Sequence, residues 1–498
     1  MPRSASLVLS LILLWPQRAA AQFASELPSF DFVREKTAAL NASAFERAKY
    51  LVNSGPGQEH PDVPPHESLL MARLNALADL MHGIEEASGR TSLQFKHLQR
   101  LKQGVDYLDI YFVDPIAEER WDAIFSAMGG AAKNGYASRY RHDWDKTVDA
   151  MLKAGFAALK ESHSAYLTSN EWKSFQDWAS NADVAGIGAV VEGVPEGAKI
   201  RVVVPHAGAA AAGLMPGDVI VSADGASLAG KSRADIVQKL LGPAGTTVVL
   251  AVIRAGIPTP LRIKVSRSAF KTPTSFSKML DGKVGYVYFA QFDLTTDDAV
   301  FERIRGLRAQ GAKSLILDVR GNPGGVVGVV ASIASEFLRN GEDIVSFSHQ
   351  GLLSEDYRTD GDGEFSRLPV AVLVDGGSAS ASEILSGALQ DHGYAVIGSQ
   401  TYGKGTEQVV FGLPSGGFII TENRWYTPSN RNINGTLDAD GREIPGTGGI
   451  TPNSSVTVSE AQAAKIMQDL LDQLYEVPGS GSEPDPVLAE AQKRLSSR

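Results

Sequence analysis

The sequence contains no cysteine, which excludes several kinds of chemistry. Without thiols the chain can form no disulfide, no cysteine-ligated metal site, no thiol nucleophile and no cysteine-linked lipid anchor. Histidine is scarce as well: nine histidines are scattered along the chain, and no HExxH pair occurs. We therefore expect neither a metal ion nor another cofactor.

Positive charge is in deficit, with 47 Lys and Arg against 57 Asp and Glu and a net charge of −10. This balance gives no reason to expect a nucleic-acid partner. Long apolar runs are also lacking. Leu7–Trp15 has nine residues, whereas about 20 are needed to span a bilayer.

That short run has the features of a secretory signal peptide. Arg3 precedes it, and the small residues Ala19–Ala21 follow it before Gln22. We expect residues 1–21 to be removed and the mature chain to have no transmembrane span. The predicted localisation is outside the cytoplasm, most simply in a bacterial periplasm.

The remaining chain is long enough for two or three domains. Apolar residues spaced four and three apart, from Leu70 to Met81, predict helices in the first part. Short β-branched runs between glycine turns predict a β-rich domain, and strand–helix alternation predicts an α/β core. We predict a signal peptide over residues 1–21 and a helical region over residues 22–165. A β-rich domain follows over residues 176–268, an α/β core over residues 269–475, and a linker with a short helix over residues 476–498.

Three alternating serines lie in Gly376–Ile384, between a predicted strand and a predicted helix. The unpaired amides and the dipole at a helix N-terminus favour an adjacent anion. A serine there has its hydroxyl beside an oxyanion hole, as acyl transfer requires. The pattern leaves open whether Ser378, Ser380 or Ser382 reacts, and a serine at this place is more often only a helix cap.

Two further segments could serve the same acyl-transfer chemistry, one with a candidate base and one with a glycine-rich turn. Lys404 stands between two glycines, which allow close approach to a neighbouring backbone. Lysine accepts a proton only when neutral, a form that burial in an apolar site favours. Gln408 could orient it by a hydrogen bond. The glycine-rich turn in Leu317–Gly325 could point amides at an oxyanion, and it lacks the phosphate-loop pattern.

In their order along the chain, the glycine-rich turn, the serine segment and the lysine segment resemble the C-terminal-processing, or tail-specific, serine proteases. The resemblance covers about residues 155–475. Within this range, Val284–Phe292, Tyr426–Pro428 and Gly448–Asn453 match the family as well. It implies a crotonase-like α/β protease core within a multidomain α/β protein.

The resemblance also implies roles for individual residues. Ser380 is the implied nucleophile, Lys404 the general base and Gln408 its support. The implied oxyanion hole consists of backbone amides, from Ala381 and from Gly324 or Gly325.

The β-rich domain resembles a PDZ domain through Ala185–Val191 and Ala209–Gly225. The implied carboxylate-binding amides are those of Gly186, Ile187, Gly188 and Ala189. A substrate tail would add as a strand beside them, with Ile187 and Leu240 lining a pocket for an apolar last side chain. The implied activity is cleavage of exported proteins with unstructured, apolar C-termini, and the resemblance allows an activating adaptor protein and a homo-oligomer.

Two other interpretations compete with this one. A Ser-His-Asp hydrolase could use Asp391 and His392, but these lie at the far end of a helix that starts near Ser380 and spans about 15 Å. A non-catalytic PDZ scaffold is the alternative from another class, and the presence of all three expected side chains argues against it.

Overall fold

The computed structural model describes residues 65–498 except 232, 437–443, 445–446, 478–483 and 497–498. The predicted signal peptide and the start of the predicted helical region lie outside the described residues. No described helix is long and apolar enough to cross a membrane. The chain divides into two compact units, one within residues 17–102 and 122–155 and the other containing residues 103–121 and 156–498.

Helices form the described part of the first unit. They are α2 (Pro65–Ala87), α3 (Phe95–Tyr111), α4 (Glu118–Asn134), the π-helix η2 (Gly135–Arg139) and α5 (Trp144–Ala158). Three of them, α3, α4 and α5, extend into the second unit. On α2 the predicted apolar face buries Leu70, Leu77 and Met81. The carboxylate of Glu85 accepts hydrogen bonds from the Leu93 amide at 2.6 Å and from the Trp144 indole at 3.3 Å, which ties α2 to α5.

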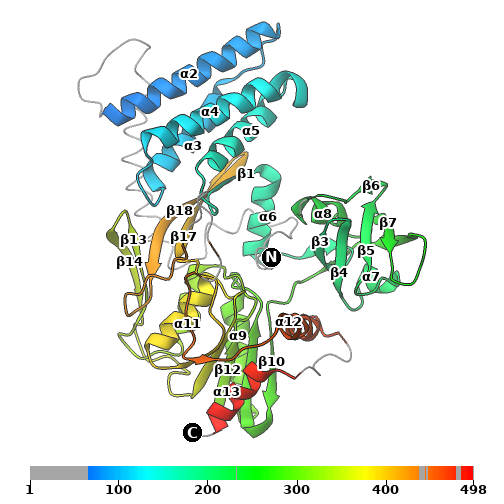
Figure 1. Ribbon diagram of the computed structural model, residues 1–498, viewed down its shortest axis with the longest axis vertical. Helices are drawn as coiled ribbons and strands as arrows, with labels where there is room; N and C mark the ends of the chain where they lie inside the picture. The colour runs from blue at the N-terminus through cyan, green and yellow to red at the C-terminus, as the bar shows by residue number, and fades with distance from the viewer. Residues whose placement is uncertain (1–64, 232, 437–443, 445–446, 478–483, 497–498) are drawn as a thin grey trace. The chain divides into compact units, whose positions relative to one another are not determined.

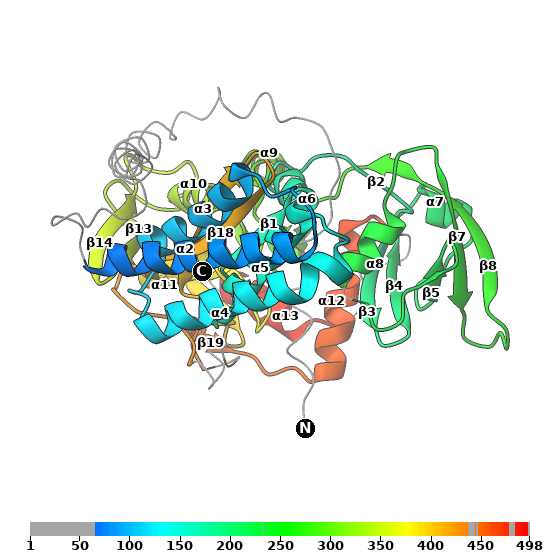
Figure 2. The same cartoon turned by 90° about the horizontal axis from the view of Figure 1, so that it is seen from above.

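The β-rich domain is part of the second unit, and Figure 2 shows several of its strands side by side. Its elements are β2 (Val184–Gly186), β3 (Ala189–Val194), β4 (Gly197–Val203), α7 (Gly208–Ala211), β5 (Val219–Ala223), β6 (Ala226–Ser227), α8 (Arg233–Leu240), β7 (Thr247–Ile253), β8 (Leu261–Ser266) and β9 (Ser268–Phe270). The main sheet has the order β3-β4-β5-β7-β8, so β3 is an edge strand in the described chain.

The core is built on a six-stranded sheet in the order β10-β11-β12-β15-β16-β19. Its strands are β10 (Ser275–Leu280), β11 (Val284–Phe289), β12 (Ser314–Asp318), β15 (Val370–Val374), β16 (Ala395–Gly398) and β19 (Ser454–Ser455). From β11 onward the neighbours run parallel. Because both faces are covered, β11, β12, β15 and β16 are buried along their whole length.

Alternate residues of these strands contact different helices. One face packs on α9 (Thr296–Ala309), α10 (Val327–Ser335) and α11 (Ala381–Asp391). The other packs on α12 (Glu460–Leu474) and α13 (Pro486–Ser496), which lie near β10 and β12 in Figure 1. The core is therefore a three-layer α/β/α arrangement.

A second, antiparallel sheet carries the predicted lysine turn on its edge. It contains β1 (Ala165–Thr168), β13 (Asp343–His349), β14 (Leu352–Arg358), β17 (Thr406–Leu413) and β18 (Gly416–Tyr426). The remaining described elements are α6 (Ser169–Ala179) and η3 (Asp281–Lys283). The turns after β12, β15 and β16 leave the same edge of the core sheet, where sites of open parallel sheets form.

Candidate active site

Ser380 occupies the sharp turn between β15 and α11. It is the N-cap residue of the helix, with φ 55° and ψ −117°. Residues other than glycine avoid this backbone region, at a cost of about 1–3 kcal/mol. The amides of Glu383 and Ile384 hold the turn by donating to the Ser380 carbonyl at 2.7 and 2.9 Å.

Burial distinguishes the three serines of this turn. Ser378 and Ser382 are fully buried. Their hydroxyls donate to the carbonyls of Val319 and Asn322, each at 2.8 Å. Ser380 alone keeps a partly exposed side chain, so it is the one of the three that a substrate can reach.

The glycine-rich turn after β12 packs directly on Ser380. The Ala379 amide donates to the Asn322 carbonyl at 3.0 Å. A Cβ placed on Gly324, whose φ is 106°, would lie 2.8 Å from the Ser380 Cβ and 2.9 Å from the Ala381 nitrogen. Only glycine fits there without displacing the serine turn.

The two glycines differ in how their amides are used. The Gly324 amide donates to the Asn322 side chain at 2.8 Å. Within the described part of the chain, the amides of Gly325 and Ala381 donate no hydrogen bond. Gly325 and Ala381 therefore have the amides available to an oxyanion.

Lys404 lies in the turn that leads into β17, and its side chain is partly buried. Its Nζ donates to Gln408 Oε1 at 2.7 Å, the orienting contact that the sequence predicts. Gln408 Nε2 in turn donates to the hydroxyls of Thr406 and Thr421 at 3.2 and 3.3 Å. The amide of Gln408 is thus fixed in the orientation that presents oxygen to the lysine.

Glu383 joins the serine and lysine turns, a link that sequence reasoning missed. Its Oε2 accepts from the Ser380 and Lys404 amides at 2.8 and 2.9 Å. Its Oε1 accepts from the Gly403 amide at 2.7 Å and from the Thr401 hydroxyl at 2.5 Å. Burial raises the pKa of Glu383 to about 7, although these four donors work in the opposite direction. The available signal was the capping-box spacing of Ser380 and Glu383.

The competing Ser-His-Asp interpretation finds no support in the geometry. Asp391 lies at the C-terminal end of α11, where its carboxylate accepts from the Ser429 amide at 2.9 Å. His392 Nε2 contacts the Asp343 carbonyl at 2.7 Å.

The described residues contain no group of three or more His, Cys, Asp or Glu that could hold a metal ion.

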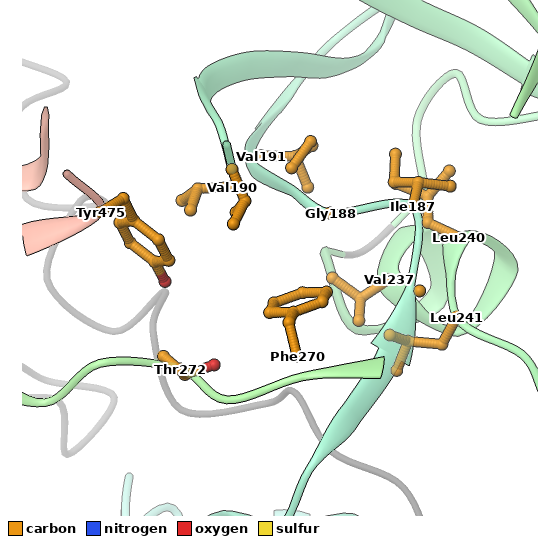
Figure 3. Close-up of a pocket in the computed structure, with 13 residues that line it drawn as sticks. Ile187, Gly188, Val190, Val191, Val237, Leu240, Leu241, Phe270, Thr272 and Tyr475 are labelled. Carbon is orange, nitrogen blue, oxygen red and sulfur yellow. The ribbon is translucent and has the colours of Figure 1, made fainter. Parts of the chain in front are cut away.

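The predicted tail-binding loop lines a pocket that the β-rich domain forms together with Thr272 and with Tyr475, the C-cap residue of α12 (Figure 3). Gly188 has φ 77° there, and Ile187 is almost fully buried. The pocket lies beside the edge strand β3 and the helix α8, and apolar side chains dominate it. Its lining residues are Gly186, Ile187, Gly188, Ala189, Val190, Val191, Val204, Val237, Leu240, Leu241, Phe270, Thr272 and Tyr475.

Comparison with known proteins identifies both domains. The family model "Peptidase family S41" matches residues 283–456, and the model "PDZ domain" matches residues 199–254. A carboxy-terminal-processing protease of Bartonella bacilliformis is 35% identical over 304 residues, which cover 59% of this chain and 68% of that protein. The carboxy-terminal processing protease CtpA of Bacillus subtilis is 32% identical over 311 residues, covering 61% and 66%.

A solved structure gives the corresponding likeness in fold. It is a photosystem II D1 C-terminal processing protease, 24% identical with a TM-score of 0.50, and the alignment covers 79% of this chain and 99% of that one. The fold and the sequence matches define a serine peptidase with a PDZ domain. The chain belongs to peptidase family S41, the carboxy-terminal-processing proteases. The crotonase-like description of its core stays a prediction.

Proposed function

We propose that this peptidase cleaves exported proteins near their C-termini, with Ser380 as nucleophile and Lys404 as general base. The observation that carries the proposal is the convergence of three turns on Ser380. The glycine turn touches it at Gly324, and Glu383 hydrogen-bonds to the backbone of both Ser380 and Lys404.

The proposed reaction is acyl transfer in two steps. Neutral Lys404, oriented by Gln408, takes the hydroxyl proton as Ser380 Oγ attacks the scissile carbonyl. The amides of Ala381 and Gly325 receive the oxyanion. The amine then leaves with that proton, and a water molecule hydrolyses the acyl-enzyme and frees Ser380.

Substrate selection is assigned to the PDZ domain. The free edge of β3 can accept an extended tail as a further strand, and the adjoining pocket suits an apolar last side chain. The loop from Gly186 to Ala189 would hold the terminal carboxylate.

Export to a bacterial periplasm rests on the predicted signal peptide. An activating adaptor protein and a homo-oligomer stay predictions.

The test is cleavage of a disordered protein ending in apolar residues, followed by mass spectrometry. We expect wild type and Ser382→Ala to cut near the C-terminus, and Ser380→Ala and Lys404→Ala not to cut. Cleavage surviving in Ser380→Ala would refute the nucleophile. A wild-type protein that binds the tail without cutting it would favour the scaffold alternative.

A further inference from the structure

The C-terminal segment of the chain contacts the glycine turn that lies against Ser380. Asp485 immediately precedes α13, and its two carboxylate oxygens accept from Arg320 Nη1 at 3.1 Å and Nη2 at 2.7 Å. Arg320 belongs to the turn after β12, four residues before Gly324. The two partners are 165 residues apart in sequence.

Arg320 is enclosed by carboxylates on two sides. Its Nε donates to Asp318 at 3.0 Å, and Tyr286 donates its hydroxyl to the same carboxylate at 2.7 Å. Burial opposes the charge of the guanidinium, but Asp318 and then Asp485 outweigh burial and raise the Arg320 pKa well above its usual value. A planar guanidinium bound by two carboxylates has little freedom to rotate.

The helix α12 packs against the same turn through Met467. Gly321 has φ 68°, and a Cβ on it would lie 2.3 Å from the Met467 methyl carbon. Ile466, Leu470 and Leu474 of α12 share one buried cluster with Val487, Ala491 and Leu495 of α13. Both C-terminal helices are thus anchored on the sheet and border the turn.

Two hydrogen bonds and one close backbone approach join the turn that contains Arg320 to the turn that contains Ser380. The Gly321 amide donates to Asp375 Oδ1 at 2.8 Å, and the Asn322 carbonyl accepts from the Ala379 amide. Gly324 then contacts Ser380. Because a misplacement of about 1 Å can cost roughly a hundredfold in rate, the position of this turn matters for any oxyanion amide in it.

We propose that Asp485 is a positioning residue of this peptidase, which holds Arg320 and thereby sets the turn that supplies an oxyanion-hole amide. The inference rests on the proposed role of Ser380. It gives the last segment of the chain, beyond the matched region 283–456, a part in catalysis.

A purely structural role for Asp485 is the competing explanation. Asp485 Oδ1 also accepts from the Val487 and Leu488 amides at 3.1 and 3.0 Å, as a helix N-cap does. Serine and asparagine cap helices about as well as aspartate. Asp485→Ser therefore keeps the cap and loses the contact with Arg320, whereas Asp485→Asn keeps the cap and one acceptor for Arg320.

The experiment compares the full-length wild type with Asp485→Ser, Asp485→Asn and Ser380→Ala. Glu490→Gln, which removes one charge elsewhere on α13, is the matched control. The measurements are kcat and KM on a disordered protein with an apolar tail, inhibition by a peptide aldehyde, and the melting temperature. The aldehyde forms a hemiacetal oxyanion on the nucleophile and therefore reports on the oxyanion hole.

We expect Asp485→Ser to lower kcat at least tenfold and to weaken aldehyde binding by a similar factor. KM should change less than twofold, Asp485→Asn should lie between Asp485→Ser and wild type, and Glu490→Gln should match wild type. Unchanged kcat in Asp485→Ser overturns the inference, as does a loss of activity with unchanged aldehyde affinity. Cleavage by Ser380→Ala, or none by wild type, would instead contradict the proposed function.

Discussion

The carboxylate of Glu383 accepts a 2.9 Å hydrogen bond from the backbone amide of Lys404, across 21 residues of sequence. The same oxygen accepts from the amide of Ser380. One fully buried side chain thus sets the distance between the turn of the proposed nucleophile and the turn of the proposed base.

Glu383→Gln should therefore impair both stability and activity. The new amide NH₂ group must face two donors on one side of the side chain, which leaves buried groups unsatisfied at a cost of about 1–3 kcal/mol. Urea unfolding measures the first effect, and cleavage by the folded fraction measures the second. Glu460→Gln, at an exposed position of α12, should change neither. Full activity in Glu383→Gln would contradict the linking role.

The stability of the protein should fall as the pH rises from about 4.5 to 7. Burial raises the pKa of Glu383 and of Glu407 to about 7 from a usual value of 4.5. When the pKa of a carboxyl group is higher in the folded than in the unfolded state, the folded protein binds the proton more tightly. The group then stabilises the fold fully at a pH below its unfolded-state pKa. This stabilisation is lost as the pH rises through the folded-state pKa.

Glu407→Gln should reduce this fall by up to about 3 kcal/mol, because glutamine resembles the protonated acid and keeps an acceptor for Asn423. The free energy of unfolding, measured by urea at pH 4.5 and pH 7.5, tests this. An identical difference in wild type and Glu407→Gln would show that Glu407 titrates normally.

Gly324→Ala should abolish cleavage, whereas Gly328→Ala should leave it near the wild-type rate. The first adds a methyl group at φ 106° against Ser380, while a Cβ at Gly328 would meet nothing within 4 Å. We expect a loss of at least a hundredfold in turnover of a peptide substrate, with circular dichroism unchanged. An active Gly324→Ala enzyme would show that the glycine turn is not adjacent to the reacting atoms.

Tail recognition should depend on a free C-terminal carboxylate. A peptide ending in an apolar residue should bind about tenfold more tightly than its C-terminal amide, as measured by calorimetry. Leu241→Asp, which places a negative charge in the pocket lining, should weaken binding of the carboxylate peptide more than that of the amide. Equal affinities for both peptides in wild type would argue against carboxylate capture by the loop at Gly186–Ala189.

The sequence predicted best what depends on local patterns. The buried strand Val370–Val374 is a continuous apolar run, and Ser314–Asp318 has one at its centre. Glycine and serine clusters marked the turns that meet at Ser380. The hairpin strand β14 escaped prediction because its residues are mostly exposed and show no apolar alternation.

Contacts between distant segments could not be predicted in the same way. Nothing local distinguishes Asp485 from an ordinary helix cap, and its partner Arg320 becomes evident only after the sheet has formed. Glu383 carried a capping-box signal, but its bond to Lys404 depends on how the turn after β16 folds back. The residue pattern left three serines open, and only the family resemblance singled out Ser380; the structure adds that Ser378 and Ser382 are fully buried.

The most direct test of the account is to map the residue that a serine-reactive fluorophosphonate labels in the wild-type protein. We predict a single adduct on Ser380, identified by peptide mass spectrometry, and no adduct in Ser380→Ala. An adduct on Ser378, Ser382 or a residue outside this turn, or undiminished labelling of Ser380→Ala, would contradict it.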